Sequence, residues 1–157
     1  MKKIIIVITF LMVLITLSAC DAFDRDDFAR VGDTRANGQI SFTVETIYLE
    51  DDSFGDLEED ETFLAIEITV QNIGTVITRE ISLDDDFILA NGTNYPLIDT
   101  IESTDTLEGR LEVGERKTAI LIYKVPLDFE ALTFTFNTPM QADGIFIYEL
   151  LKNDLES

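Results

Sequence analysis

The stretch TFLAIEITVQN, residues 62–72, alternates apolar and polar side chains with a period of two. Successive side chains of an extended chain point to opposite faces, so this pattern gives one apolar and one polar face. The apolar face comprises Leu64, Ile66, Ile68 and Val70, and the polar face comprises Glu67, Thr69 and Gln71. The stretch therefore predicts a half-buried β-strand.

Further strands are indicated on both sides of this stretch. LTFTFNT (132–138) alternates in the same way. ISFTVETIYLE (40–50) alternates but changes phase after Val44, as a β-bulge or a bend would produce. AILIYKV (119–125) and IFIYELL (145–151) are apolar on both faces, which suits central strands or strands covered on both sides.

Turn-forming residues separate these segments, and no stretch after residue 38 keeps a helical stripe for ten residues. Many short strands without crossover helices predict an all-β fold, an antiparallel immunoglobulin-like β-sandwich. The expected strands lie near 39–49, 62–71, 77–83, 87–90, 94–97, 107–113, 118–125, 131–138 and 145–151.

Four short motifs between residues 39 and 150 resemble, in their order and spacing, an immunoglobulin-like domain of unknown function. They are VQNIG (70–74), FxLxxGxxY (87–95), LxVGE (111–115) and YxVP (123–126). The chain departs from the pattern at Val113, where proline is usual, and at Tyr123, where phenylalanine is usual. The resemblance implies a surface-displayed sandwich of secreted Gram-positive lipoproteins, similar to the mycobacterial immunoprotective secreted antigen, with no established catalytic residues.

The amino terminus has the anatomy of a secretion signal. Lys2 and Lys3 precede a charge-free run, Ile4–Leu17, which is shorter than the roughly 20 apolar residues that a spanning helix needs. The four residues that end at Cys20, LSAC, resemble the lipobox of bacterial lipoproteins, in which the cysteine receives a diacylglycerol and becomes the first mature residue. A buried thiol or an unpaired leftover cysteine is the alternative, but a thiol at the end of this apolar run has no core to be buried in.

This anatomy divides the chain into three parts and predicts its location. Residues 1–19 are expected to be a lipoprotein signal peptide, 20–38 the lipidated cysteine and a flexible tether, and 39–157 the sandwich domain. Within the tether, Phe23 and Phe28 could instead dock on the domain or on the bilayer. We expect a lipid-anchored protein on the extracytoplasmic side of the cell membrane.

Charge limits the partners. The chain has 11 basic and 31 acidic residues, a formal net charge of −20, and loss of Lys2 and Lys3 with the signal peptide leaves 9 basic residues. Nucleic-acid binding is not expected, because it depends on Lys and Arg neutralising phosphate charge. The expected partners are the membrane, reached through Cys20, and an unknown protein or basic surface.

Enzymatic activity is not expected. The chain has no histidine, and its single cysteine is assigned to the lipid, so Ser-His, Cys-His and histidine-metal sites are excluded. Carboxylate chemistry remains, but no nucleophile-and-base pattern accompanies it. The sequence thus predicts a binding or structural module of the cell envelope.

An acidic segment, EDDSFGDLEEDE (50–61), offers a different candidate, with eight carboxylates in twelve positions. Calcium takes six to eight oxygen ligands from flexible loops, so this segment and the acidic run 84–86 could form a weak calcium site. The candidate ligands are Asp51, Asp52, Asp56, Asp84, Asp85 and Asp86. The segment does not match the EF-hand pattern, and the alternative to a calcium site is an ordinary solvent-exposed loop. The alternative function is therefore a divalent-cation-dependent adhesion or sensing domain.

Strand parity makes one more prediction. With nine strands and a tether joined at Gln39, the connections 50–61, 84–86, 98–106 and 127–130 would share the end opposite Gln39, and 72–76, 91–93, 114–117 and 139–144 would share the other. The carboxylates of Asp51, Asp56, Asp85 and Asp128 would then cluster at an outward-facing acidic pole.

Overall fold

A computed structural model describes residues 28–50, 54–78, 80–83, 87–102, 107–137 and 145–155. These residues form eight strands and one 3-10 turn at Lys152–Asp154. The strands are β1 (Thr34–Ala36), β2 (Ile40–Glu50), β3 (Glu61–Asn72), β4 (Phe87–Ala90), β5 (Thr93–Glu102), β6 (Arg116–Pro126), β7 (Ala131–Asn137) and β8 (Ile145–Leu151). In this part of the chain, no helix is long and apolar enough to cross a bilayer.

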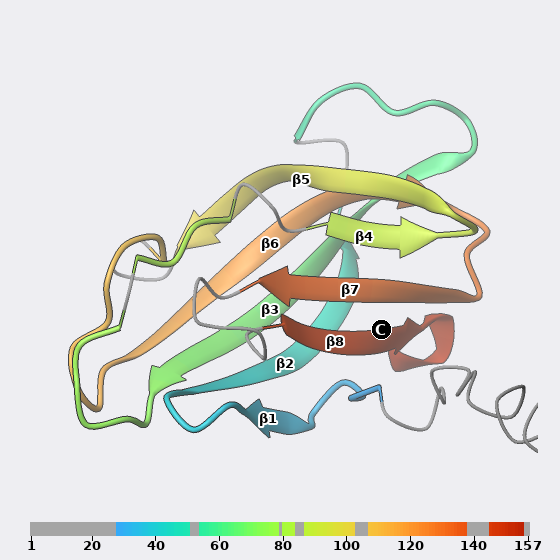
Figure 1. The fold of residues 1–157 in the computed structure, drawn as a ribbon. Coiled ribbons are helices and arrows are strands. Elements are labelled where there is room, and N and C mark those ends of the chain that lie inside the picture. Colours follow the sequence, from blue (N-terminus) through green and yellow to red (C-terminus); the bar gives the residue numbers. More distant parts are fainter. Residues whose placement is uncertain are drawn as a thin grey trace, which may run out of the picture.

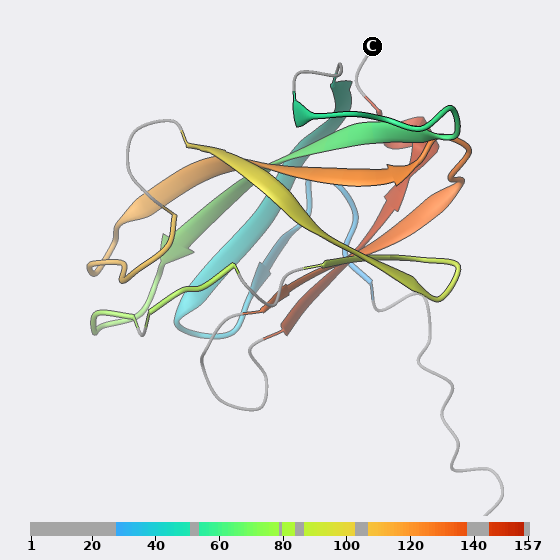
Figure 2. The same ribbon diagram turned by 90° about the horizontal axis from the view of Figure 1, so that it is seen from above.

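All strand pairs are antiparallel, in the order β1-β2-β3-β6-β5-β4-β7-β8. The sheet folds into two layers because β5 belongs to both: its first residues pair with β4 and its last with β6. The partner changes between Pro96 and Leu97, and the register with β6 shifts directly afterwards, between Leu97 and Asp99. Figures 1 and 2 show β5 passing from one layer to the other. The predicted all-β antiparallel sandwich is confirmed.

The core lies between the layers and contains the apolar face of the stretch 62–72: Leu64, Ile66, Ile68 and Val70 are all buried. Aromatic rings fill its centre. Phe42 of β2 stacks on Phe136 with ring centroids 4.2 Å apart and on Phe146 at 5.5 Å. Each such buried side chain contributes about 1.5–3 kcal/mol through apolar burial. The predicted bulge in β2 is also present, between Val44 and Thr46.

The amino-terminal boundary of the domain differs from the prediction. Residues 28–38 were expected to belong to the tether, but Ala29 is completely buried, and β1 pairs with β2. The Ala29 N–H donates to the Ile147 carbonyl, and the Ala29 carbonyl accepts from the Glu149 N–H. The segment therefore belongs to the domain because it covers the free edge of β8.

Two expected strands, 77–83 and 107–113, are corrected to irregular segments. They run side by side and form a single bridge, in which Ile81 and Gly109 exchange both backbone hydrogen bonds. Next to it, the Leu111 N–H donates to the side chain of Thr78 at 2.8 Å rather than to a backbone carbonyl. This side-chain bond replaces one ladder bond and limits the strand pairing.

With the corrected strand count, some connections lie at a different end of the sandwich from the predicted one. We call the two ends of the β2-β3-β6 layer the Asn72 end, where β3 ends and β6 begins, and the Asp60 end, where β3 begins and β6 ends. Segments 54–60 and 127–130 lie at the Asp60 end, as predicted. The 91–92 turn also lies there, and β5 ends toward the Asn72 end (Figure 1), so the predictions for 91–93 and 98–106 were wrong.

The acidic-pole prediction therefore holds only in part. Asp56 and Asp128 lie at the end opposite Gln39, whereas Asp51 and Asp85 lie outside the described residues. Because the chain joins the domain near Phe28 rather than at Gln39, strand parity does not orient the domain on the membrane.

Candidate interaction surface

An apolar strip lies on the outer face of the larger layer. Phe63 and Ala65 of β3 point away from the core, because they alternate with the inward-facing Leu64 and Ile66, and Ile122 of β6 pairs directly with Ala65. Ile101 of β5 pairs with Ile120 and is 40% exposed. Ile98, three residues earlier on β5 at the register shift, is 44% exposed. We call the strip formed by Tyr48, Phe63, Ala65, Ile98, Ile101, Ile120 and Ile122 the outer strip.

Part of the acidic segment covers one side of the outer strip. Phe54 meets Phe63 edge to face, with ring centroids 5.8 Å apart at an interplanar angle of 72°, and Leu57 packs against the same cluster. The apolar pair Phe54 and Leu57 within the acidic run was the sequence signal for this contact, and the prediction of a solvated loop or cation site missed it. Residues 54–60 therefore form an acidic flap that is docked by two apolar side chains.

The carboxylate of Glu61 fixes the end of the flap. Its Oε2 accepts the Glu58 N–H at 3.0 Å and lies 2.9 Å from the Lys124 Nζ. The Glu58 amide and then the Lys124 ammonium hold the pKa of Glu61 below its ordinary value of 4.5. One residue earlier, the Asp60 carbonyl accepts the Leu127 N–H at 2.8 Å. The flap thus ends at a defined position against β6.

Carboxylates border the outer strip. Burial raises the pKa of Tyr48, and the charges of Glu50 and Glu67 beside its phenol raise it further. Across the strip, Asp99 of β5 pairs in register with Ile122. The outer strip is therefore apolar in its middle, partly exposed and negatively charged around its border.

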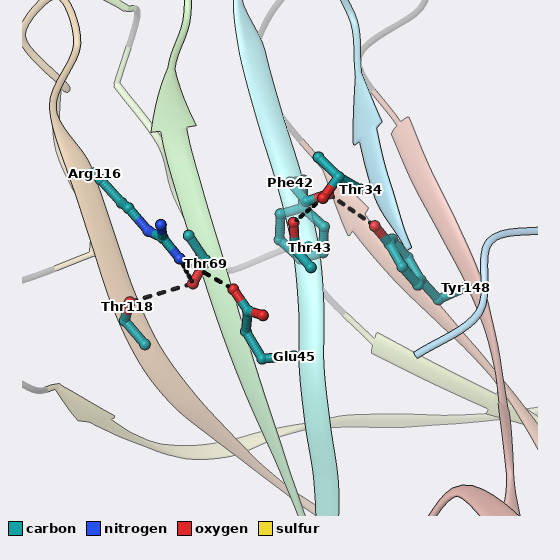
Figure 3. Close-up of polar contacts among 8 residues, drawn as sticks. All are labelled: Thr34, Phe42, Thr43, Glu45, Thr69, Arg116, Thr118 and Tyr148. Carbon is teal, nitrogen blue, oxygen red and sulfur yellow. Dashed lines mark hydrogen bonds and ion pairs between the residues drawn. The ribbon is translucent and has the colours of Figure 1, made fainter. Parts of the chain in front are cut away.

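The other half of the same face is polar and makes its own hydrogen bonds (Figure 3). The Thr34 and Thr43 hydroxyls lie 2.8 Å apart, and the Thr69 and Thr118 hydroxyls lie 3.3 Å apart. One guanidinium nitrogen of Arg116 lies 3.3 Å from the Glu45 carboxylate. These groups satisfy one another across β1, β2, β3 and β6, so the outer strip is the part of this face suited to a partner.

The predicted cation ligands are not brought together in the described residues. Asp56 is exposed on the flap, and Asp51, Asp52, Asp84, Asp85 and Asp86 lie outside the described residues, as does Cys20. Where the structure describes the chain, no group of three or more cysteine or acidic side chains could hold a metal ion. The calcium site and the lipid attachment stay predictions.

Three solved structures share the fold. A Bacillus subtilis protein, ycdA, whose assignment as a lipoprotein is itself a prediction, matches with a TM-score of 0.64 and 12% identity over 77% of this chain. This chain spans only 39% of that protein. The yjhA protein of the same organism matches with a TM-score of 0.55 and 20% identity, covering 82% of this chain and 100% of its own. A beta-sandwich protein of Clostridium difficile matches with a TM-score of 0.51 and 16% identity over 80% of this chain and 95% of its own.

The sequence comparisons give the family but no activity. No curated protein matches the chain significantly. The model of one family, described as Domain of unknown function (DUF4352), matches residues 29–145. That range begins at the buried Ala29, includes β1 to β7 and ends at the first residue of β8, so its start agrees with the folded unit rather than with the predicted boundary at residue 39. The chain therefore belongs to the DUF4352 family of domains of unknown function.

Proposed function

We propose that this protein is a lipid-anchored, extracytoplasmic binding module of the bacterial cell envelope, held to the membrane through Cys20. The signal-like amino terminus and the fold shared with the ycdA protein support the anchoring. The likeness to the mycobacterial antigen stays a prediction. The binding role rests on one observation, the partly exposed outer strip bordered by carboxylates.

The chemistry of the outer strip defines the partner. Ile98 and Ile101 offer aliphatic surface that a partner can bury, while Glu50, Glu67 and Asp99 offer charge to basic groups at its border. Burial in the middle supplies affinity, and charges at the rim speed association and select the partner. The expected partner is therefore an envelope protein with a basic, partly apolar surface. A non-catalytic role agrees with a chain that has no histidine.

Site-specific photo-crosslinking in living cells tests this proposal. A photoreactive amino acid at Ile101 should trap a specific protein, whereas the same group at Leu127, which is similarly exposed at the Asp60 end, should not. Asp99→Lys should weaken the Ile101 adduct by reversing a border charge. Asp128→Lys, at an exposed acid outside the strip, serves as the matched control. Equal adducts at both positions, or indifference to Asp99→Lys, would refute the outer strip as the binding surface.

A further inference from the structure

The Asn72 end carries a second exposed apolar group, separate from the outer strip. Two neighbouring segments, 73–78 and 112–115, contribute it (Figures 1 and 2). Its members are Ile73, Val76, Ile77 and Val113, with 47%, 60%, 47% and 54% of their surface exposed. We call these four residues the apolar tip. Large aliphatic side chains gathered at one exposed end are uncommon without a binding role.

The buried side chain of Asn72 holds the apolar tip in place. Its Nδ2 donates to the carbonyls of Val76 and Leu111, at 2.8 and 3.0 Å, and its Oδ1 accepts the Gly74 N–H at 3.0 Å. Its backbone carbonyl also accepts the Gly114 N–H. One fully buried residue thus ties both segments together, so the apolar tip is preorganised and loses little conformational freedom when it binds.

Charge differs sharply between the two ends. Segment 73–78 has no ionisable side chain, and segment 112–115 has two acids, Glu112 and Glu115. Beside them the bases Arg116 and Lys117 form ion pairs with Glu45 and Glu115, so this end is close to neutral. At the Asp60 end, segments 54–60 and 127–130 contain no Lys or Arg. Their acidic residues are Asp56, Glu58, Glu59, Asp60, Asp128 and Glu130. An anionic bilayer repels the Asp60 end and tolerates the apolar tip.

The position where the chain joins the domain also favours the Asn72 end. Ala29 forms a bridge with Tyr148 of β8, and the Tyr148 hydroxyl donates to the Phe42 carbonyl of β2. Phe42 is two residues from Ile40, which pairs with Asn72, and eight residues from Glu50 at the other end of β2. The seven residues 21–27 can extend over about 25 Å at most. A lipid at Cys20 is therefore held within about 25 Å of the start of the domain, which lies nearer to the Asn72 end than to the Asp60 end along β2.

We infer that the apolar tip docks on the bilayer that holds the lipid anchor, with Ile73, Val76, Ile77 and Val113 entering the interfacial region. This inference rests on the proposed anchoring at Cys20. Four partly exposed side chains do not hold a protein on a membrane alone, but the anchor supplies a high effective concentration. Docking would place the Asn72 end of the domain against the bilayer and direct the acidic Asp60 end away from it. The outer strip would remain exposed between the two ends.

The chain has no tryptophan, so one introduced indole can report on the docking. The full, lipidated chain is prepared as Val76→Trp and, as the control, as Leu127→Trp at the opposite end. Each is reconstituted in phosphatidylcholine vesicles containing phosphatidylglycerol, with and without brominated acyl chains. Emission from the indole at position 76 should shift to the blue and lose most of its intensity in brominated vesicles, while emission from the indole at position 127 should stay unchanged. Adding Val113→Asp to Val76→Trp should restore the emission at position 76.

Co-sedimentation with the vesicles separates the two proposals. A lipidated Val76→Trp protein that sediments but shows no quenching, or equal quenching in both variants, overturns tip docking and leaves the anchor intact. A full chain that does not sediment overturns the anchored module, and the docking with it. A blue shift of the Val76→Trp emission that grows with protein concentration without vesicles would show that the apolar tip joins two copies of the chain, which also overturns docking on lipid.

Discussion

The hydroxyl of Tyr148, on the last strand, lies 2.8 Å from the carbonyl oxygen of Phe42 on β2 and donates to it. The same hydroxyl lies 2.8 Å from the Asp33 carbonyl, just before β1. Since Tyr148 is fully buried, this contact joins the amino-terminal segment, the larger layer and β8 at one point in the core. It closes the sandwich between the first and last strands.

Tyr148→Phe should lower the free energy of unfolding by about 1–2 kcal/mol, because it removes this hydroxyl and leaves two carbonyls without that donor. Urea denaturation measures the loss. Tyr95→Phe is the control, because it removes a hydroxyl from a partly exposed tyrosine of β5 and should cost less. Equal stability of the Tyr148 variant and the wild type would mean that the contact contributes nothing.

Alkaline pH should destabilise the domain through the same residue. Burial raises the pKa of Tyr148 from 10.0 to about 12. Because the folded-state pKa lies above the unfolded value, this stabilising contribution is complete below pH 10.0 and is lost as the pH rises through about 12. Stability curves between these values should fall less steeply in Tyr148→Phe. A slope that the substitution leaves unchanged would contradict the assignment.

Asn72→Ala should cost about 2–4 kcal/mol of stability, since its side chain makes three hydrogen bonds in a buried position. The exposed Asn94 on β5 provides the matched control, and Asn94→Ala should change stability by less than about 0.5 kcal/mol. Backbone hydrogen exchange should also accelerate in segments 73–78 and 111–115 of the Asn72 variant. Unchanged exchange there would show that Asn72 does not organise the apolar tip.

Acidification should release the end of the flap. The pKa of Glu61 is lowered from 4.5, so the carboxylate stabilises the fold above pH 4.5, and this contribution is lost as the pH falls through the lower folded-state value. Carboxyl NMR titration gives the value directly. Lys124→Ala should raise the pKa only part of the way to 4.5, because the Glu58 amide is the larger cause. If Lys124→Ala restored the pKa of Glu61 fully to its ordinary value, Lys124 rather than the Glu58 amide would be the larger cause of the lowered pKa.

The sequence predicted the architecture because the period of two is a local signal. Leu64 to Val70 alternate strictly and form the inner face of β3, and the phase change after Val44 marks a real bulge. Segment 28–36 was missed for the opposite reason. It is short and charged, and it is held by Ala29 and by contacts with Tyr148, more than a hundred residues away in the chain, which no local pattern reports.

The surfaces were harder to predict than the core. Five of the eight residues of segment 54–61 are acidic, so the charge of the flap hid the docking of Phe54 and Leu57 on the outer strip. Counting 77–83 as a strand reversed the predicted directions of the next two strands and moved 91–93 and 98–106 to the wrong ends. Counting 107–113 as a strand reversed the parity again, so 127–130 was still placed at the correct end. The apolar tip could not be predicted from the sequence, because its two segments are far apart in the chain. They become neighbours only in the folded structure, where Asn72 at the end of β3 bonds to the segment before β6.

Lipid attachment at Cys20 is the claim on which the proposed function depends most directly. Metabolic labelling with a fatty acid, followed by membrane fractionation, compares the wild-type chain with Cys20→Ala in a Gram-positive host. We predict that the wild type takes up label and fractionates with the membrane, and that Cys20→Ala stays unlabelled and unprocessed. An unlabelled wild type, or a Cys20→Ala variant that is processed and retained in the membrane like the wild type, would contradict it.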